Sequence, residues 1–168
     1  MPIEPPDQKF FEAAHGYAEL GMYCDANEEL EKIDPFFRAA PEVLALRVAI
    51  YGGLEKWELM AELTGRLSEF DADNPQWPVS LAYATRRANS IEAAKEVLLN
   101  AERRFPKEAV IPYNLGCYSC QLEDLESAKK FLGRAFQIDS NWRLIALDDI
   151  DLKPLWEALA TQMREKGE

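Results

Sequence analysis

The chain has 168 residues and a formal net charge of −11, with 48% hydrophobic and 29% charged residues. This balance is typical of a folded protein rather than a disordered one, and the acidic charge disfavours nucleic-acid binding as the main role. No apolar stretch is long enough to span a bilayer. The first residues lack the basic region and apolar core of a secretory signal, so we expect a cytoplasmic protein.

A spacing of 34 residues recurs along most of the chain. Residues that suit a helix crossing stand 34 apart in three series: Ala26, Met60, Ala94 and Ala128; Leu30, Thr64, Leu98 and Leu132; Ile33, Leu67, Ala101 and Ala135. A fixed period of this length predicts stacked helical hairpins, each too small to bury its apolar face alone. The predicted units cover residues 7–40, 41–74, 75–108 and 109–142, within a single domain that spans residues 1–168.

The first two units carry the less regular pattern. In the unit at 7–40, two helical apolar faces are predicted from Phe10, Ala13, Ala14 and Tyr17, and from Ala26, Leu30 and Ile33. Its end, at residues 34–37, departs from the pattern of the other units. In the unit at 41–74, Gly52 and Gly53 come slightly before the expected turn, so we predict an irregular turn there.

The third and fourth units follow the pattern more closely. In the unit at 75–108 the first helix carries Leu81 and Ala82, a turn is predicted at Asn89 and Ser90, and Pro106 ends the second helix. The unit at 109–142 has a helical apolar face in each half, separated by residues 122–125. Small residues recur where the two helices of a hairpin would cross closely, because larger side chains do not fit there.

The period stops after Asn141, and a capping region is predicted for residues 143–166. It begins with a short helix at 143–147 and continues through an acidic turn at residues 148–151, in which Asp151 is a plausible N-cap. A last helix, predicted for residues 152–164, carries Leu155, Trp156 and Leu159 on one face. Such a segment is well placed to cover the apolar end of a repeat array.

These features resemble the tetratricopeptide repeat (TPR). The fourth unit matches its pattern at Leu115, Gly116, Ala128, Ala135 and Asp139. The first and third units also match at five positions each, and the second matches weakly, at three. The resemblance covers about four-fifths of the chain. It implies an all-α, right-handed α-solenoid of four helical hairpins with a C-terminal capping helix. It is specific for the fold and not for function, because many unrelated assemblies use such repeats.

The resemblance also implies which positions bind a partner, since the first helices of successive hairpins line a concave groove in this family. The expected groove residues are Phe11, His15, Tyr83, Arg86, Arg87, Tyr113, Asn114 and Gln121. Aromatic and arginine side chains are typical of binding hot spots, and the two arginines would take an acidic group of the partner. Alternatively, some of the rings pack between helices, and one arginine pairs with a neighbouring surface acid.

Catalytic and metal sites find little support in the sequence. Cys117 and Cys120 form a CxxC, but no second pair follows, and the default role of buried cysteines is packing. His15 is the sole histidine and has no nucleophile or paired carboxylate at a readable spacing. The acids at 148–151 lack the glycine and later glutamate of a calcium loop, so we assign them turn and capping roles. We therefore expect no enzyme activity, metal or cofactor.

The leading hypothesis is a non-catalytic protein-protein interaction module or scaffold, which binds a segment of another protein in its groove. Neither nucleic-acid binding nor membrane insertion is expected. The alternative hypothesis is a small acidic chaperone for a secreted or membrane-associated client, since size, acidity and repeat type resemble the translocator chaperones of type III secretion. A chaperone would favour a continuous apolar groove, whereas Arg86 and Arg87 favour a partly acidic segment.

Overall fold

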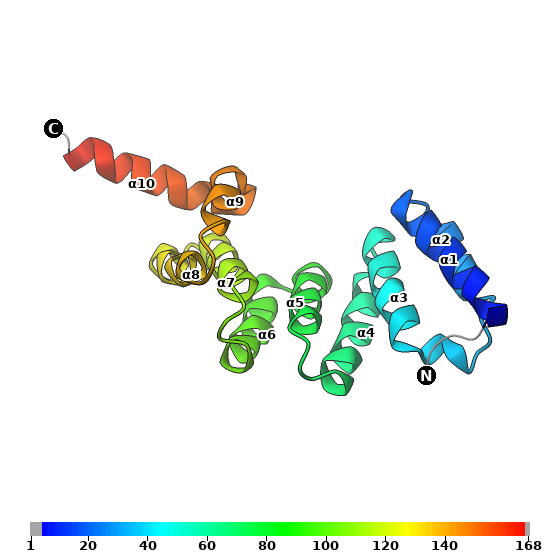
Figure 1. The fold of residues 1–168 in the computed structure, drawn as a ribbon. Coiled ribbons are helices and arrows are strands. Elements are labelled where there is room, and N and C mark those ends of the chain that lie inside the picture. Colours follow the sequence, from blue (N-terminus) through cyan, green and yellow to red (C-terminus); the bar gives the residue numbers. More distant parts are fainter. Residues whose placement is uncertain (1–4, 167–168) are drawn as a thin grey trace. The chain divides into compact units, whose positions relative to one another are not determined.

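The computed structural model describes residues 5–166, and within this range it contains ten α-helices, two short 3₁₀ helices and no strand (Figure 1). Its contacts divide the chain into two compact units, Met1–Leu67 and Ser68–Glu168, which are described separately below. The helices of the first unit are α1 (Pro5–Glu19), α2 (Tyr23–Leu30), η1 (Phe37–Ala39), α3 (Pro41–Gly53) and most of α4 (Trp57–Phe70). The boundary between the units falls within α4, after Leu67. Those of the second unit are α5 (Gln76–Ala88), α6 (Ile91–Arg104), α7 (Val110–Gln121), α8 (Leu125–Ile138), α9 (Trp142–Asp148), η2 (Ile150–Leu152) and α10 (Lys153–Lys166).

The 34-residue period is visible in the backbone of the turns that join the helices of each hairpin. Gly21, Glu55 and Glu123 all have positive φ angles, of 73°, 56° and 61°, and they stand at multiples of 34 along the chain. Only Gly21 adopts this left-handed conformation without steric cost. Asn89, at the fourth equivalent position, instead has a φ of −134°.

Equivalent N-caps begin the second helices of the third and fourth hairpins. The Ser90 side chain accepts a hydrogen bond from the backbone N–H of Ala93 at 3.1 Å, and Asp124 accepts one from Ser127 at 3.0 Å. Each cap satisfies a donor that the first turn of a helix leaves unpaired. The two caps are 34 residues apart, so the sequence repeat fixes the start of α6 and α8.

The first unit is built on the α1–α2 hairpin and α3. Ala14 and Ala26 are fully buried, and the ring of Tyr23 lies so close to Gly53 that a Cβ there would stand 2.3 Å from it. The irregular end predicted for residues 34–37 is confirmed, because α2 stops at Leu30 and only a short 3₁₀ helix follows.

A polar clamp holds this irregular stretch in the first unit. Arg38 donates from Nε to the Ile33 carbonyl at 2.7 Å and from Nη1 to the Glu31 carboxylate at 2.6 Å. Arg47 of α3 donates to the other oxygen of Glu31 at 2.6 Å. These three charged side chains, the Glu31 clamp, therefore link the end of α2 to η1 and α3.

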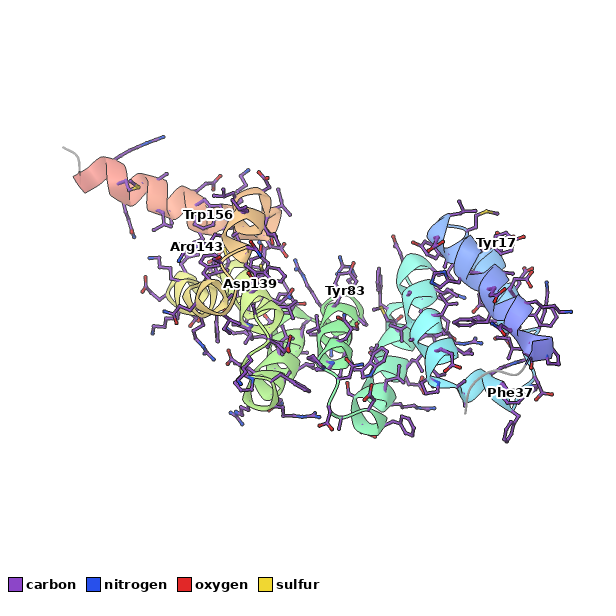
Figure 2. All side chains as sticks on the ribbon, viewed as in Figure 1. Tyr17, Phe37, Tyr83, Asp139, Arg143 and Trp156 are labelled. Carbon is purple, nitrogen blue, oxygen red and sulfur yellow. The ribbon has the colours of Figure 1, made fainter. Side chains whose placement is uncertain are left out.

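The second unit is centred on α7, in which nine of the twelve residues are buried. This helix packs against both α6 and α8, and Gly116 allows the close approach of α8, since a Cβ there would lie 2.7 Å from Leu132. Leu152 and Leu155, at 0% and 1% exposure, complete the same core from the C-terminal segment. Trp156 of α10 also donates to the Ala146 carbonyl at 2.9 Å, and both it and Arg143 of α9 are marked in Figure 2.

Candidate functional site

Three of the predicted groove residues, all on the first helices of hairpins in the second unit, contact the acidic turn, residues 148–151. Arg86 projects from α5, and Tyr113 and Gln121 project from α7 at a spacing that keeps them on one face of that helix. Asn114 stands beside this face, where its side chain donates to the Val110 carbonyl of its own helix at 2.8 Å. Arg86, Tyr113 and Gln121, together with Cys117, are called the second-unit surface below.

The carboxylate of Asp151 binds Arg86 across this surface. The guanidinium donates through both Nη1 and Nη2, and the Nη2–Oδ1 distance is 2.9 Å. Both side chains are only 23% exposed. A two-point contact of this kind is the strongest arrangement between an arginine and a carboxylate. The hydrogen bond to Asp151 raises the pKa of Arg86 despite its partial burial, so the arginine stays charged.

Asp149 and the backbone of the acidic turn make the remaining contacts. The Tyr113 hydroxyl donates to Asp149 Oδ2 at 2.7 Å, and the Cys117 thiol lies 3.5 Å from the same oxygen. Gln121 Nε2 donates to the carbonyl of Asp151 at 2.8 Å. Asp149 Oδ1 accepts from the Asp151 N–H at 2.9 Å, so Asp149 is the N-cap of η2, and the N-cap role predicted for Asp151 is wrong.

The environment of Tyr113 and Cys117 suppresses ionisation. Burial, and then the hydrogen bond to Asp149, raises the pKa of the Tyr113 hydroxyl well above its ordinary value. Burial, and then the charge of Asp149, raises the pKa of the Cys117 thiol in the same way. A thiol without access to its thiolate form is a poor nucleophile. Within residues 5–166, no three His, Cys, Asp or Glu side chains gather closely enough to hold a metal ion.

The other predicted groove residues lie apart from the acidic turn. Tyr83 projects from α5 with 42% of its surface exposed, and the Arg87 guanidinium lies 3.8 Å from its ring centroid (Figure 2). Phe11 and His15 belong to the first unit. Phe11 is half-buried against the core of that unit, and exposed His15 lies 3.5 Å from Glu19.

The role of the acidic turn was not visible in the sequence. Arg86 was expected to take an acidic group from a partner, but in the structure it binds Asp151, 65 residues further along the same chain. The ring of Tyr113 packs on Trp142 with centroids 4.3 Å apart, which agrees with the alternative that some of the rings pack between helices. The available signal is two aspartates, spaced by one residue, after the short helix that follows the last repeat.

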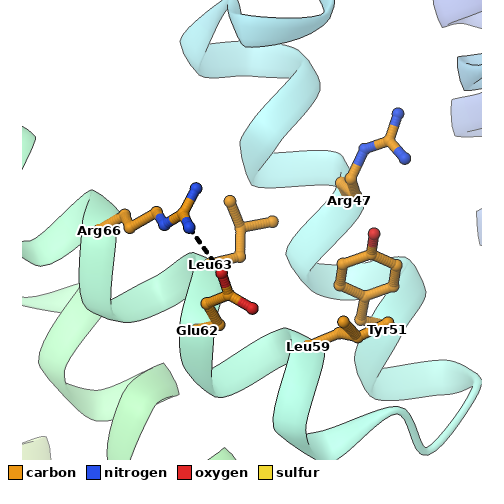
Figure 3. A pocket seen from close by; sticks show the side chains of 6 residues that line it. All are labelled: Arg47, Tyr51, Leu59, Glu62, Leu63 and Arg66. Carbon is orange, nitrogen blue, oxygen red and sulfur yellow. Dashed lines mark hydrogen bonds and ion pairs between the residues drawn. The ribbon is translucent and has the colours of Figure 1, made fainter.

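The first unit contains a small hollow between α3 and α4. It is lined by Arg47, Tyr51, Leu59, Glu62, Leu63 and Arg66 and has a volume of about 170 Å³ (Figure 3). Small-molecule sites usually measure roughly 300–1,000 Å³, so this hollow suits a single side chain better than a metabolite. Its Arg66 already pairs with Glu62 at 2.6 Å, and its Arg47 pairs with Glu31.

Comparison with solved structures identifies similar folds. The chain resembles TTC0263, a thermophilic TPR protein in Thermus thermophilus, with a TM-score of 0.64 and 19% identity over 80% of this chain and 75% of that one. It resembles YrrB, a TPR protein described as having an unusual peptide-binding site, with a TM-score of 0.64 and 19% identity over 80% and 69% of the two chains. A MamA RS-1 ArsTM double mutant gives a TM-score of 0.66 and 14% identity over 81% and 76%.

No protein-family model and no curated protein matches the sequence. The structural similarities nevertheless confirm the predicted all-α fold class and the resemblance to TPR proteins at the level of the fold. Folds of this kind generally serve as protein-protein interaction modules and are typically non-catalytic. None of the helices within residues 5–166 is long and apolar enough to cross a membrane.

Proposed function

We propose that this chain, which has the fold of the tetratricopeptide-repeat proteins, is a non-catalytic module that binds a segment of another protein on its first helices. The binding residues are the predicted groove set: Phe11 and His15 in the first unit, and Tyr83, Arg86, Arg87, Tyr113, Asn114 and Gln121 in the second. The partner segment is extended or helical and at least partly acidic.

The observation that carries this proposal is the acidic turn bound on the second-unit surface. Arg86, Tyr113 and Gln121 already hold two carboxylates and a backbone carbonyl of a peptide segment. Their donors therefore have the spacing and direction that recognition of such a segment requires. This surface recognises both charge and backbone, as peptide-binding modules do.

Tyr83 and Arg87 extend this surface along α5. They follow the spacing of one helix face together with Arg86, and the stacked guanidinium keeps its planar donors beside the ring. Tyrosine and arginine are enriched among the residues that dominate binding energies, because they bring large contact area and directional hydrogen bonds. A partner that contacts the second unit is therefore expected to touch Tyr83.

The chemistry of the same surface supports binding rather than catalysis. Its potential nucleophile, Cys117, is buried, and burial holds its pKa far above the range in which a thiolate forms. The Tyr113 hydroxyl is held as a donor to Asp149. A general base or nucleophile needs a pKa near the working pH, and these groups are shifted away from it.

Site-specific photo-crosslinking in the cells that naturally make the protein tests the proposal. A benzophenone amino acid replaces Tyr83 in one variant and Phe70, which is 80% exposed at the end of α4, in a control. We expect a discrete protein adduct from position 83, weakened by Arg87→Glu, and none from position 70. Equal adducts from both positions, or none from either, would contradict binding on α5.

A further inference from the structure

The acidic turn, residues 148–151, is held on the second-unit surface almost entirely by polar contacts. Asp151 binds Arg86 through both carboxylate oxygens, and its carbonyl accepts from Gln121. Asp149 accepts from Tyr113. Every one of these contacts joins a side chain of α5 or α7 to an acceptor on the turn, so the pattern is that of a peptide bound by its carboxylates and one carbonyl.

Apolar burial is sparse both in the acidic turn and in α9, which precedes it. Leu144, Ile145, Leu147 and Ile150 are 70%, 51%, 69% and 78% exposed, and Ala146 is the buried residue of α9. Burial resumes with Leu152 and Leu155, at 0% and 1% exposure. The chain is therefore fixed to the core again at Leu152 and Leu155, whereas the turn before them depends on interactions that another carboxylate-bearing segment is able to supply.

Exchange of the turn for such a segment leaves no charge unpaired. An Arg86 without a carboxylate would be a partly buried cation without its counter-charge, which is unfavourable. A partner that brings one carboxylate to Arg86 and another to Tyr113 replaces each contact with an equivalent one. A partner with apolar or basic side chains at these positions leaves Arg86 and Tyr113 without acceptors. The cost of these unpaired groups makes the surface select acidic segments over apolar or basic ones.

We propose that the acidic turn is an internal competitor for the partner site of the second unit. The inference rests on the proposed function and names the partner chemistry: an acidic protein segment with two carboxylates separated by one residue. This segment binds by displacing Asp149 and Asp151 from Arg86, Tyr113 and Gln121, while Leu152 and α10 stay in place. Because a short tether gives the turn an effective concentration on the order of millimolar, the intact turn weakens binding of a dilute partner.

Peptide binding in solution tests the exchange. The probe is a fluorescently labelled, acetylated and amidated peptide with the sequence of residues 147–152, LDDIDL, and the readout is fluorescence anisotropy with the full-length protein. The first variant is Asp151→Ala, which removes the internal carboxylate from Arg86. The matched control is Asp148→Ala, which makes the same charge change at the exposed neighbouring acid.

We expect Asp151→Ala to bind the peptide at least tenfold more tightly than the wild type, and Asp148→Ala to bind it as the wild type does. Addition of Arg86→Gln to Asp151→Ala should abolish the gain, and a peptide with asparagine in place of each aspartate should not bind. In the wild type, saturating peptide should increase amide hydrogen exchange at residues 147–151 but not in α10.

Three outcomes would overturn the inference. The first is equal affinity of Asp151→Ala and Asp148→Ala for the peptide. The second is tight binding of the asparagine peptide. The third is loss of the helical circular dichroism signal in Asp151→Ala, because the turn would then be a structural clamp. An adduct from position 83 in cells together with any of these results leaves the proposed function standing, whereas absence of the adduct contradicts that function whatever the peptide does.

Discussion

The two units of this protein are both built from helical hairpins, but polar contacts and apolar burial contribute to their irregular segments in different proportions. In the first unit, the stretch between α2 and α3 buries Ile33, which is 0% exposed, and is held further by the Glu31 clamp, whose carboxylate is 47% exposed. In the second unit, the segment after α9 inserts Leu152 and Leu155 into the core beside α7. Apolar burial thus anchors both segments, and in the first unit the ion pairs of the Glu31 clamp add to it.

The two kinds of interaction differ widely in the free energy that they contribute. Exposed ion pairs contribute roughly 0–1 kcal/mol each, whereas full burial of a leucine side chain contributes about 1.5–3 kcal/mol. The C-terminal segment should therefore be an integral part of the second unit from Leu152 onward, and the clamp should be a minor contributor to the first. Substitutions in each unit test this contrast.

Leu152→Ala should lower the free energy of unfolding more than any other substitution proposed for the two units. Removal of a fully buried leucine costs about 2–5 kcal/mol through lost transfer energy and the cavity left behind, and Leu152 is 0% exposed. Ile150→Ala, two residues earlier and 78% exposed, should change stability by less than about 0.5 kcal/mol. Urea unfolding followed by tryptophan fluorescence measures both, and similar losses for the two variants would disprove the assignment of Leu152 as the anchor.

Gly116→Ala tests the tight crossing of α7 and α8. The added Cβ would stand 2.7 Å from buried Leu132, so overpacking of about 1–3 kcal/mol outweighs the gain in helix propensity. Gly133 of α8 is the matched control, because no atom lies within 4 Å of a Cβ built there. Gly133→Ala should stabilise by up to about 1 kcal/mol. In thermal unfolding, we expect Gly116→Ala to lower the melting temperature and Gly133→Ala to raise it. A rise for both variants would contradict the close crossing of α7 and α8.

The hairpins were predictable because they follow from repeated local constraints. Ala94 and Ala128 are fully buried as their spacing predicts, since a small side chain is needed at every close crossing. The caps Ser90 and Asp124 also recur with the period. A structural constraint that recurs in every hairpin selects similar residues at each equivalent position, so the sequence reveals it several times.

The candidate site was only partly predictable, because its decisive contact occurs once. Arg86 was identified as a residue that takes an acid, and its guanidinium does bind a carboxylate. That the acid is Asp151 depends on how the chain reverses after α9, outside the period, where no repeat constrains it. The acids at 148–151 were assigned turn and capping roles, which fits Asp149 at the start of η2 but misses the contacts with α5 and α7.

Two buried hydroxyls sharpen the contrast between the units. Thr64 of α4 is fully buried and donates to the Met60 carbonyl at 2.7 Å. Ser119 of α7 is equally buried, but its hydroxyl meets no hydrogen-bond partner within the described part of the chain. Thr64→Val should therefore cost about 0.5–1.5 kcal/mol, whereas Ser119→Ala should be neutral or stabilising. Chemical denaturation of both variants checks this, and a clear loss for Ser119→Ala would mean that its hydroxyl is satisfied in solution.

Glu31→Gln should have the smallest effect, because it weakens the clamp without leaving a cavity. The hydrogen bond from Arg47, with the charges of Arg47 and Arg38, lowers the pKa of Glu31 below its ordinary value. The folded state therefore binds this proton less tightly than the unfolded state does, so the stabilisation is present at neutral pH and disappears as the pH falls through the lowered pKa. Since the carboxylate is half exposed, we expect about 0.2–1 kcal/mol at pH 7, less in high salt.

The measurement is the difference in unfolding free energy between wild type and Glu31→Gln across acidic and neutral pH. The difference should be constant at neutral pH and shrink toward zero in acid. A difference that persists unchanged in acid would mean that the clamp acts through packing of the arginine stems rather than through charge. In that case apolar contacts, among them those of buried Ile33, would close the first unit without help from charge, and the contrast with the second unit would disappear.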